Sequence, residues 1–264
     1  MRATKPLLLA AIIAIAGLGG YAAAQQHSAR PALPPEFRAY LPSASVALAD
    51  YVPDVIPGSP EDRYDRAAFK ATRKLAGSPR WALAQADSGR GALKAFSCAA
   101  GVNLTSDNVP ALVKLLTRYR TDLINATRLP VAGTAARPYQ RDRGAVCIAD
   151  KALANAGTTP AIQSAWGWTL GLVLAESIPE RTDALMARAR AYGDSAAICG
   201  FASEHEVRGG RELASALLAR SRAVADFAQD LTAAKAQVET AARSNGAAPE
   251  GCAAENALVT PGRR

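Results

Sequence analysis

The chain has 264 residues and a formal net charge of +8, with 31 Lys and Arg against 23 Asp and Glu. This length suffices for one sizeable core or two small ones. The basic residues, such as Arg63, Arg118 and Arg220, are spread along the sequence and are not interleaved with aromatic side chains. Such a distribution is typical of solvated helix faces, argues against a nucleic-acid partner, and leaves room for a mild preference for anionic ligands.

The first 24 residues have the parts of a secretory signal peptide. Arg2 and Lys5 supply a positive start, residues 7–18 are apolar, and a run of alanines ends at Ala24. A membrane anchor is the alternative, but an apolar stretch of 12 residues spans only about 18 Å as a helix, against roughly 30 Å of hydrocarbon core. We therefore predict cleavage after Ala24, a periplasmic location, and no membrane attachment of the mature chain.

Residues 25–60 contain seven prolines. This composition predicts an extended arm that wraps the domain following it in the sequence. From Glu61 onward, apolar residues recur at the spacing of a helix, and no alternating strand pattern of useful length occurs. We therefore predict one all-α domain at 61–243 and a C-terminal tail at 244–264. The expected helices are 63–75, 79–86, 91–100, 110–127, 160–177, one that starts at Pro179 and carries Tyr192, and a long final helix at 206–243.

All four cysteines lie in the predicted mature chain: Cys98, Cys147, Cys199 and Cys252. An even number in an exported protein favours two disulfides, and three pairings are open at this point. Zinc binding is the alternative, but no two cysteines lie close together and the only histidines are His27 and His205. The sequence therefore predicts disulfides and no metal.

Two segments carry most of the functional information. Residues 160–168 read PAIQSAWGW, and residues 195–206 read SAAICGFASEHE. With shorter matches at 64–67, 95–97, 110–116 and 137–139, they resemble the bacterial class A nonspecific acid phosphatases of the type 2 phosphatidic-acid-phosphatase and vanadium-haloperoxidase superfamily. The resemblance implies that family's helical fold over roughly residues 63–238.

The resemblance also implies a reaction, the hydrolysis of phosphomonoesters through a phosphohistidine without metal or cofactor. In the family, the first segment reads Pro-Ser-Gly-His, and the second reads Ser-Arg, five residues, His, three residues, Asp. One histidine, supported by the aspartate, attacks phosphorus, and the other protonates the leaving oxygen. A lysine, two arginines and serine donors bind the equatorial oxygens, where charge develops in the transition state.

This chain keeps the framework and lacks most of those side chains. By the resemblance, Gln163 stands for the acid histidine and Ala202 for the nucleophile. Gln163 cannot protonate an alkoxide and a methyl group cannot form a phosphoenzyme, so we interpret the chain as a pseudoenzyme with no assigned catalytic residue. The other family positions are Pro130 for the lysine, Arg137 for one arginine, Ala196 for the other, Glu206 for the aspartate, and a retained Ser195.

Two hypotheses follow for the old site. Arg137 and Ser195 are a phosphate-binding remnant, able to hold phosphate or a similar anion at the start of the helix near Pro160; the alternative is an ion pair between Arg137 and Glu206. His205 is a relocated nucleophile, about 60° around a helix from Ala202. Glu206 cannot support it because adjacent helix residues do not face each other, and a solvated or capping histidine is the alternative.

Three functions remain open: a pseudophosphatase that binds anions, an altered phosphatase using His205 or activated water, and a helical scaffold whose protein partner the sequence does not reveal. Trp168 is expected in the core, and Trp166 replaces a small residue and is expected to fill part of the old pocket. The resemblance further implies a Cys147–Cys199 bond and, with it, a Cys98–Cys252 bond that ties the tail to the domain.

Overall fold

The chain divides into two units, Met1–Ala32 and Leu33–Arg264. Every residue that the structure describes belongs to the second unit. The predicted signal peptide and, within the second unit, Pro130 lie outside the described residues. Each regular element in the described ranges is helical, which confirms the predicted all-α fold. The computed structural model describes residues 34, 37–42, 51, 54–89, 91–127, 136–147, 161–244 and 248–259.

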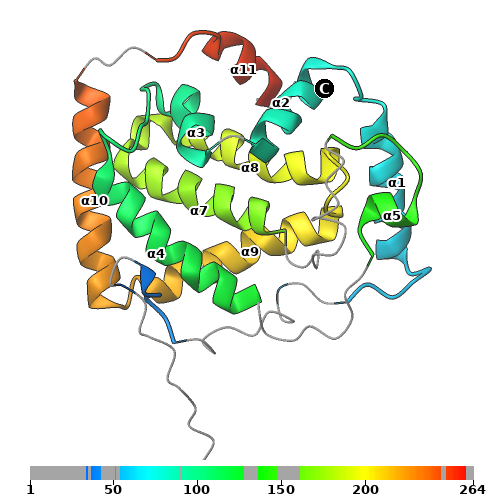
Figure 1. Cartoon of the computed structure of the whole chain (residues 1–264), viewed down its shortest axis with the longest axis horizontal. Coiled ribbons are helices and arrows are strands. Elements are labelled where there is room, and N and C mark those ends of the chain that lie inside the picture. Colours follow the sequence, from blue (N-terminus) through cyan, green and yellow to red (C-terminus); the bar gives the residue numbers. More distant parts are fainter. Residues whose placement is uncertain are drawn as a thin grey trace, which may run out of the picture. The chain divides into compact units, whose positions relative to one another are not determined.

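Two helices that lie side by side occupy the centre of this unit (Figure 1). They are α7 (Ile162–Ser177) and α8 (Thr182–Ile198), joined by the short 3-10 helix η3 (Pro179–Arg181). Gly167 and Gly171 of α7 allow close packing, because a Cβ on either glycine would lie 2.5 Å from Tyr192 or Ala189 of α8. Larger residues at these two positions would force the central helices apart.

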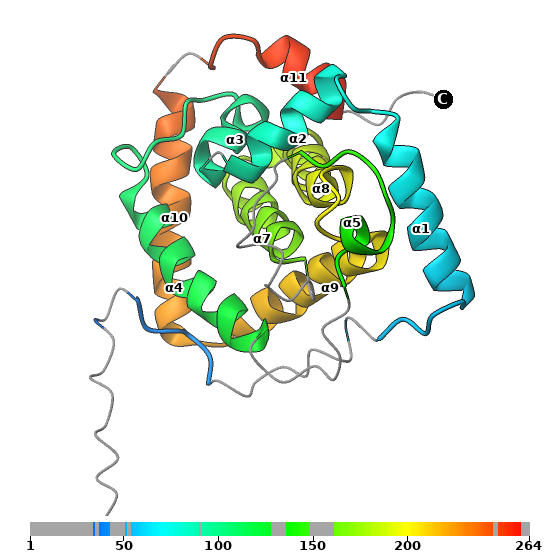
Figure 2. The ribbon, with the colours of Figure 1, turned by 45° about the vertical axis from the view of Figure 1, so that its right-hand side comes forward.

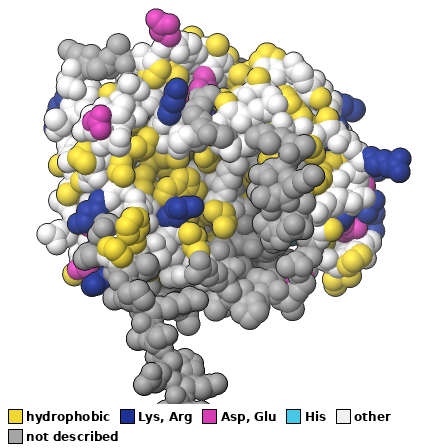
Figure 3. Space-filling view, in the orientation of Figure 1, with side chains coloured by type: hydrophobic (Ala, Val, Ile, Leu, Met, Phe, Trp, Pro, Cys, Tyr) yellow, Lys and Arg dark blue, Asp and Glu magenta, His cyan; other side chains and the backbone are white. Residues whose placement is uncertain are grey.

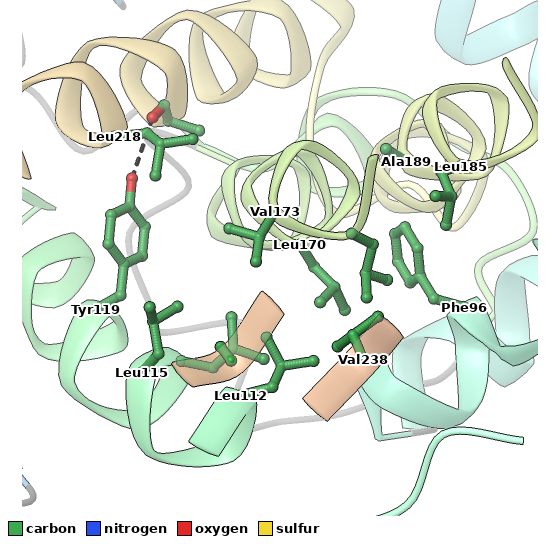
Figure 4. Close-up of a cluster of buried hydrophobic side chains, with 14 of the residues drawn as sticks. Phe96, Leu112, Leu115, Tyr119, Leu170, Val173, Leu185, Ala189, Leu218 and Val238 are labelled. Atoms are coloured by element: carbon green, nitrogen blue, oxygen red, sulfur yellow. Dashed lines mark hydrogen bonds between the residues drawn. The ribbon is translucent and has the colours of Figure 1, made fainter. Parts of the chain in front are cut away.

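Helix α7 is apolar on nearly every side because other helices enclose it. Figure 2 shows α7 nearly end-on, within a ring of neighbours. Tyr119 joins two of these neighbours, since its hydroxyl donates to the Ala214 carbonyl at 3.0 Å (Figure 4). None of the described helices has both the length and the apolar character that a membrane span requires. The enclosing helices are α3 (Ala92–Ala100), α4 (Pro110–Thr127), α9 (Glu204–Ser221) and α10 (Ala225–Arg243), with α8.

The remaining described helices are α1 (Pro60–Arg73), α2 (Pro79–Gly89), α5 (Pro138–Arg141) and α11 (Cys252–Val259). Arg73, the last residue of α1, closes the C-terminal end of α8. Its guanidinium donates to the carbonyl of Ala197 at 3.2 Å and to that of Ile198, groups that lack partners inside the helix. Burial lowers the pKa of Arg73 to about 10.

The prediction of one helix over 206–243 is wrong, because α9 ends at Ser221 and α10 begins at Ala225. At the break, Val224 is extended and its amide donates to the Ser221 carbonyl at 2.9 Å. The break gives the two helices different partners: α9 packs chiefly on α7, and α10 chiefly on α4. Neither glycine nor proline marks this position, so the sequence pattern runs through it.

Residues 37–42 of the predicted N-terminal arm pack on α4 and α10. Asp122 of α4 accepts from the amides of Tyr40 and Leu41 at 3.1 and 2.9 Å. The Tyr40 hydroxyl donates to Asp230 of α10 at 2.7 Å, and its ring lies 3.9 Å from the guanidinium carbon of Arg118. Backbone hydrogen bonds, a buried hydroxyl and a cation–π contact thus hold residues 37–42 against the helices.

The four cysteines form Cys98–Cys252 and Cys147–Cys199 bonds, the pairs that the resemblance implies. The first bond joins α11 to α3 across 154 residues of sequence. Glu255 of α11 gives a second attachment, with its Oε1 atom 2.9 Å from Nε of Arg188 in α8. The C-terminal helix is therefore fixed to the domain at two points.

Candidate active-site region

The start of α7, the end of α8 and the start of α9 meet at one place. The Ala161 amide, just before α7, donates to the Glu206 carbonyl at 3.4 Å, and Ser164 Oγ donates to the Val207 carbonyl at 2.7 Å. Gly210 permits this approach, since a Cβ there would lie 2.7 Å from the Ala161 carbonyl oxygen. These contacts bring together the two sequence segments that carry the family resemblance.

An apolar cluster fills the centre of this junction. Its members are all at most 6% exposed, and none of their side chains carries a hydrogen-bonding or titratable group. Positions 196 and 202, where the resemblance places an arginine and the nucleophile, therefore present only methyl groups. We call this the alanine cluster: Ala161, Ala196, Ala197, Ala202 and Val207.

The polar residues predicted around the cluster are engaged in structural hydrogen bonds. Gln163 Nε2 donates to the Tyr192 carbonyl at 2.8 Å, across to α8. The Glu206 carboxylate accepts from the Ser203 amide at 2.7 Å and from the Ser203 hydroxyl at 2.8 Å, which makes a capping box at the start of α9.

Arg137 lies beside the loop that carries Ala202. It is 7% exposed, and its Nη1 atom donates to the Phe201 carbonyl at 3.0 Å. Burial lowers the pKa of Arg137, and the neighbouring Tyr139 and Glu206 offset only part of that effect. A buried guanidinium is therefore retained at this junction, near the carboxylate with which an ion pair was predicted.

Ser195 belongs to a separate network between α2 and α8. Its fully buried hydroxyl lies 2.7 Å from Asp87 Oδ2, and it accepts from Arg80 Nη1 at 3.1 Å. Asp87 also pairs with the fully buried Arg188, with 3.1 Å between Nη1 and Oδ2. Sequence reasoning missed these three charged partners, because a charged residue on a helix is more often solvated than buried.

Trp166 and Trp168 also differ in their surroundings. Trp168 packs against the main core and donates from Nε1 to Ser215 Oγ at 3.1 Å. Trp166 packs against the same core and lines a surface groove beside α3 and α4, whereas the alanine cluster is made of other residues. The expectation that Trp166 fills part of the old pocket stays a prediction.

His205 has a carboxylate partner that the sequence did not suggest. Its Nδ1 atom lies 2.5 Å from Asp65 Oδ2, and its amide donates to Asp65 Oδ1 at 3.2 Å. Asp65 is 3% exposed and lies in α1, 140 residues away. The sequence feature that could have indicated this contact is Asp65 itself, which lies in the matched segment 64–67 on the turn of α1 that faces the domain.

The surface beside His205 has an acidic lining. A hollow of about 450 Å³ is lined by His205, Arg208 and three carboxylates, those of Asp54, Glu61 and Glu212, with apolar residues. Arg208 is already paired with Glu61. The field in this hollow therefore disfavours a dianionic phosphomonoester. No group of three His, Cys, Asp or Glu side chains among the described residues could hold a metal ion.

Comparison with known proteins identifies the family. The chain is 32% identical over 198 residues to an acid phosphatase of Zymomonas mobilis, covering 73% of this chain and 75% of that protein. It is 29% identical over 203 residues to the non-specific acid phosphatase of Salmonella typhimurium and 32% identical over 204 residues to that of Providencia stuartii, covering 72% of this chain and 79% of each relative. No protein-family model matches. The chain belongs to the bacterial class A non-specific acid phosphatase family.

Proposed function

We propose that this protein is an exported pseudophosphatase, a family member that has lost phosphomonoester hydrolysis. The alanine cluster carries the proposal, since it occupies the positions where the family reaction needs a histidine and an arginine. At the family's acid position, Gln163 is bound to the Tyr192 carbonyl, and its amide cannot protonate a leaving oxygen. Losing the nucleophile and the acid together removes the covalent route, because residues of one catalytic unit act jointly.

Residual anion binding is the second part of the proposal. Arg137 supports it, because a buried guanidinium beside the loop that carries Ala202 is a strong donor to phosphate. Ser195 does not add to it, since its hydroxyl is engaged with Asp87 and Arg80. We expect phosphate or vanadate to raise the melting temperature of the wild type, and the shift to disappear in Arg137→Ala. If neither phosphate nor vanadate raises the melting temperature of the wild type, a helical scaffold that binds a protein partner is favoured instead.

A second candidate function is an altered phosphatase that uses His205. The hydrogen bond from His205 Nδ1 to Asp65 favours it, because a carboxylate on one ring nitrogen leaves the other as a base. The acidic lining of the neighbouring hollow opposes it. The pseudophosphatase therefore remains the favoured function, and the altered phosphatase is the second candidate.

The deciding experiment is hydrolysis of a chromogenic phosphomonoester by the purified protein between about pH 4 and pH 8, where histidine chemistry operates. Turnover at background in the wild type supports the pseudophosphatase. Turnover that His205→Ala abolishes and Arg137→Ala leaves intact would establish the altered phosphatase.

Export and domain limits complete the proposal. We propose cleavage after Ala24, a periplasmic location, an arm at 25–60, a helical domain at 61–243 and a tail at 244–264 tethered by Cys252. The two disulfides support an oxidising compartment. Mass spectrometry of the protein from its host tests the cleavage site, because a mature chain beginning at Gln25 is expected.

A further inference from the structure

A groove of about 590 Å³ lies between α3, α4 and the first turns of α7. Leu104 and Leu116 line it at 2% and 5% exposure, and the half-buried Leu93 and Trp166 and the 46% exposed Phe37 line it as well. Figure 3 shows hydrophobic side chains gathered around a hollow on this face. Its volume falls within the roughly 300–1,000 Å³ of sites that hold small organic ligands.

The charges of this groove have one sign. Lys94 and Arg120 are the charged side chains among its described lining residues, and both are exposed. Neither forms an ion pair with a described residue. The other polar side chains carry hydroxyls, and all four are engaged. Thr117 Oγ1 donates to the Val113 carbonyl at 2.8 Å, and Thr121 Oγ1 to the Phe37 carbonyl at 3.1 Å. Ser106 Oγ donates to Asp107 Oδ1 at 3.5 Å, and Thr105 Oγ1 accepts from the Asn108 amide at 3.3 Å.

We propose that this groove binds a free single-chain amphiphile with an anionic head, such as a fatty acid. Apolar walls match a hydrocarbon chain, whose transfer from water contributes about 0.8 kcal/mol per buried CH₂. Lys94 and Arg120 give the head two cations without a competing carboxylate in the described lining. The groove shares no residue with the alanine cluster, so the inference is independent of whether the protein hydrolyses phosphomonoesters.

The negative charge of the head group distinguishes this ligand from an uncharged hydrophobic one. A neutral alcohol with the same chain keeps the apolar contacts and loses the interaction with both cations. A trimethylammonium amphiphile adds repulsion. We therefore expect the affinity to fall in the order carboxylate, alcohol, ammonium.

The test is calorimetric titration of the purified protein with dodecanoate, dodecanol and dodecyltrimethylammonium, the two ions below their micelle-forming concentrations and the alcohol below its solubility limit. One dodecanoate per chain is expected, together with a change in tryptophan emission that Trp166→Phe removes, since Trp166 lines the groove. The double variant Lys94→Glu, Arg120→Glu should bind dodecanoate about tenfold more weakly or worse. The control is Lys70→Glu, which alters charge at an exposed position of α1.

Thr117→Phe gives a second, charge-neutral test, because a ring in the groove should block the chain without altering the cations. The proposal is overturned if dodecanoate does not bind saturably, if the ammonium amphiphile binds as well, or if the double variant behaves like Lys70→Glu. Binding to anionic phospholipid vesicles without binding of free dodecanoate would also overturn it, since that result assigns the groove to a membrane surface.

Discussion

Asp65 in α1 accepts two hydrogen bonds from a single residue, His205, one from its backbone amide and one from its imidazole Nδ1. This pair fixes the start of α9 against α1, because a carboxylate that is 3% exposed has few other partners. His205, on the first turn of α9, is thus held through one ring nitrogen by a structural contact.

The first prediction concerns this pair. Asp65→Ala should lower the free energy of unfolding by about 1–3 kcal/mol, because it leaves donors at the start of α9 without their acceptor. Urea unfolding followed by circular dichroism measures the loss. Asp107→Ala, at an exposed position, is the matched control. Equal stability of the two variants would contradict the role assigned to Asp65.

Arg188 gives the second prediction. Burial disfavours its charged form, but hydrogen bonds and charge from Asp87 and Glu255 outweigh burial and raise its pKa. Arg188→Met should therefore destabilise by about 3–5 kcal/mol, because Asp87 becomes a buried charge without its partner. Arg190→Met is the control, on an exposed position of the same helix. Thermal unfolding compares them, and similar melting temperatures would refute the assignment.

The third prediction is a pH dependence at Asp230. Burial opposes its charged form, yet hydrogen bonds from Lys114, Tyr40 and Arg118 lower its pKa below the ordinary value of 3.8. A carboxylate with a lowered pKa contributes stability above its unfolded pKa and loses it as the pH falls through the folded value.

Asp230→Asn should therefore cost about 1–3 kcal/mol near neutral pH. The difference in free energy of unfolding between wild type and variant should become smaller as the pH falls below about 4. Urea unfolding at several pH values measures this difference. A difference that stays constant from neutral to acidic pH would show that Asp230 contributes through packing and not through its charge.

The fourth prediction ranks the disulfides by access. Cys252 is half-buried in a short helix near the end of the chain, whereas Cys199 is fully buried. Mild reduction should open Cys98–Cys252 first, since thiol exchange needs access to a sulfur atom. Alkylation followed by mass spectrometry should label Cys98 and Cys252 before Cys147 and Cys199. The reverse order would show that access to the sulfur atoms does not decide which bond is reduced first.

Sequence patterns predicted most of the helices from local periodicity, and the family resemblance implied both disulfides. The short helices α5 and α11 were not predicted. The patterns also did not predict the break between α9 and α10, since Ser221–Val224 contains no helix breaker and the apolar stripe continues. Asp65 was missed as the partner of His205 because 140 residues separate them. The surroundings of Ser195 were missed for the same reason, since Asp87 and Arg80 come from α2.

The alanine cluster makes it costly to restore the family's catalytic side chains one at a time. Ala202→His alone would place an imidazole among methyl groups, and Ala196→Arg alone would place a guanidinium there, each at a cost in stability before any activity appears. By the resemblance, return to the family reaction would need changes at 163, 196 and 202 together, besides those at Pro130 and Glu206. Under the proposed function, single substitutions at these small, buried side chains would lower stability without restoring phosphatase activity, so the loss of activity is hard to reverse one residue at a time.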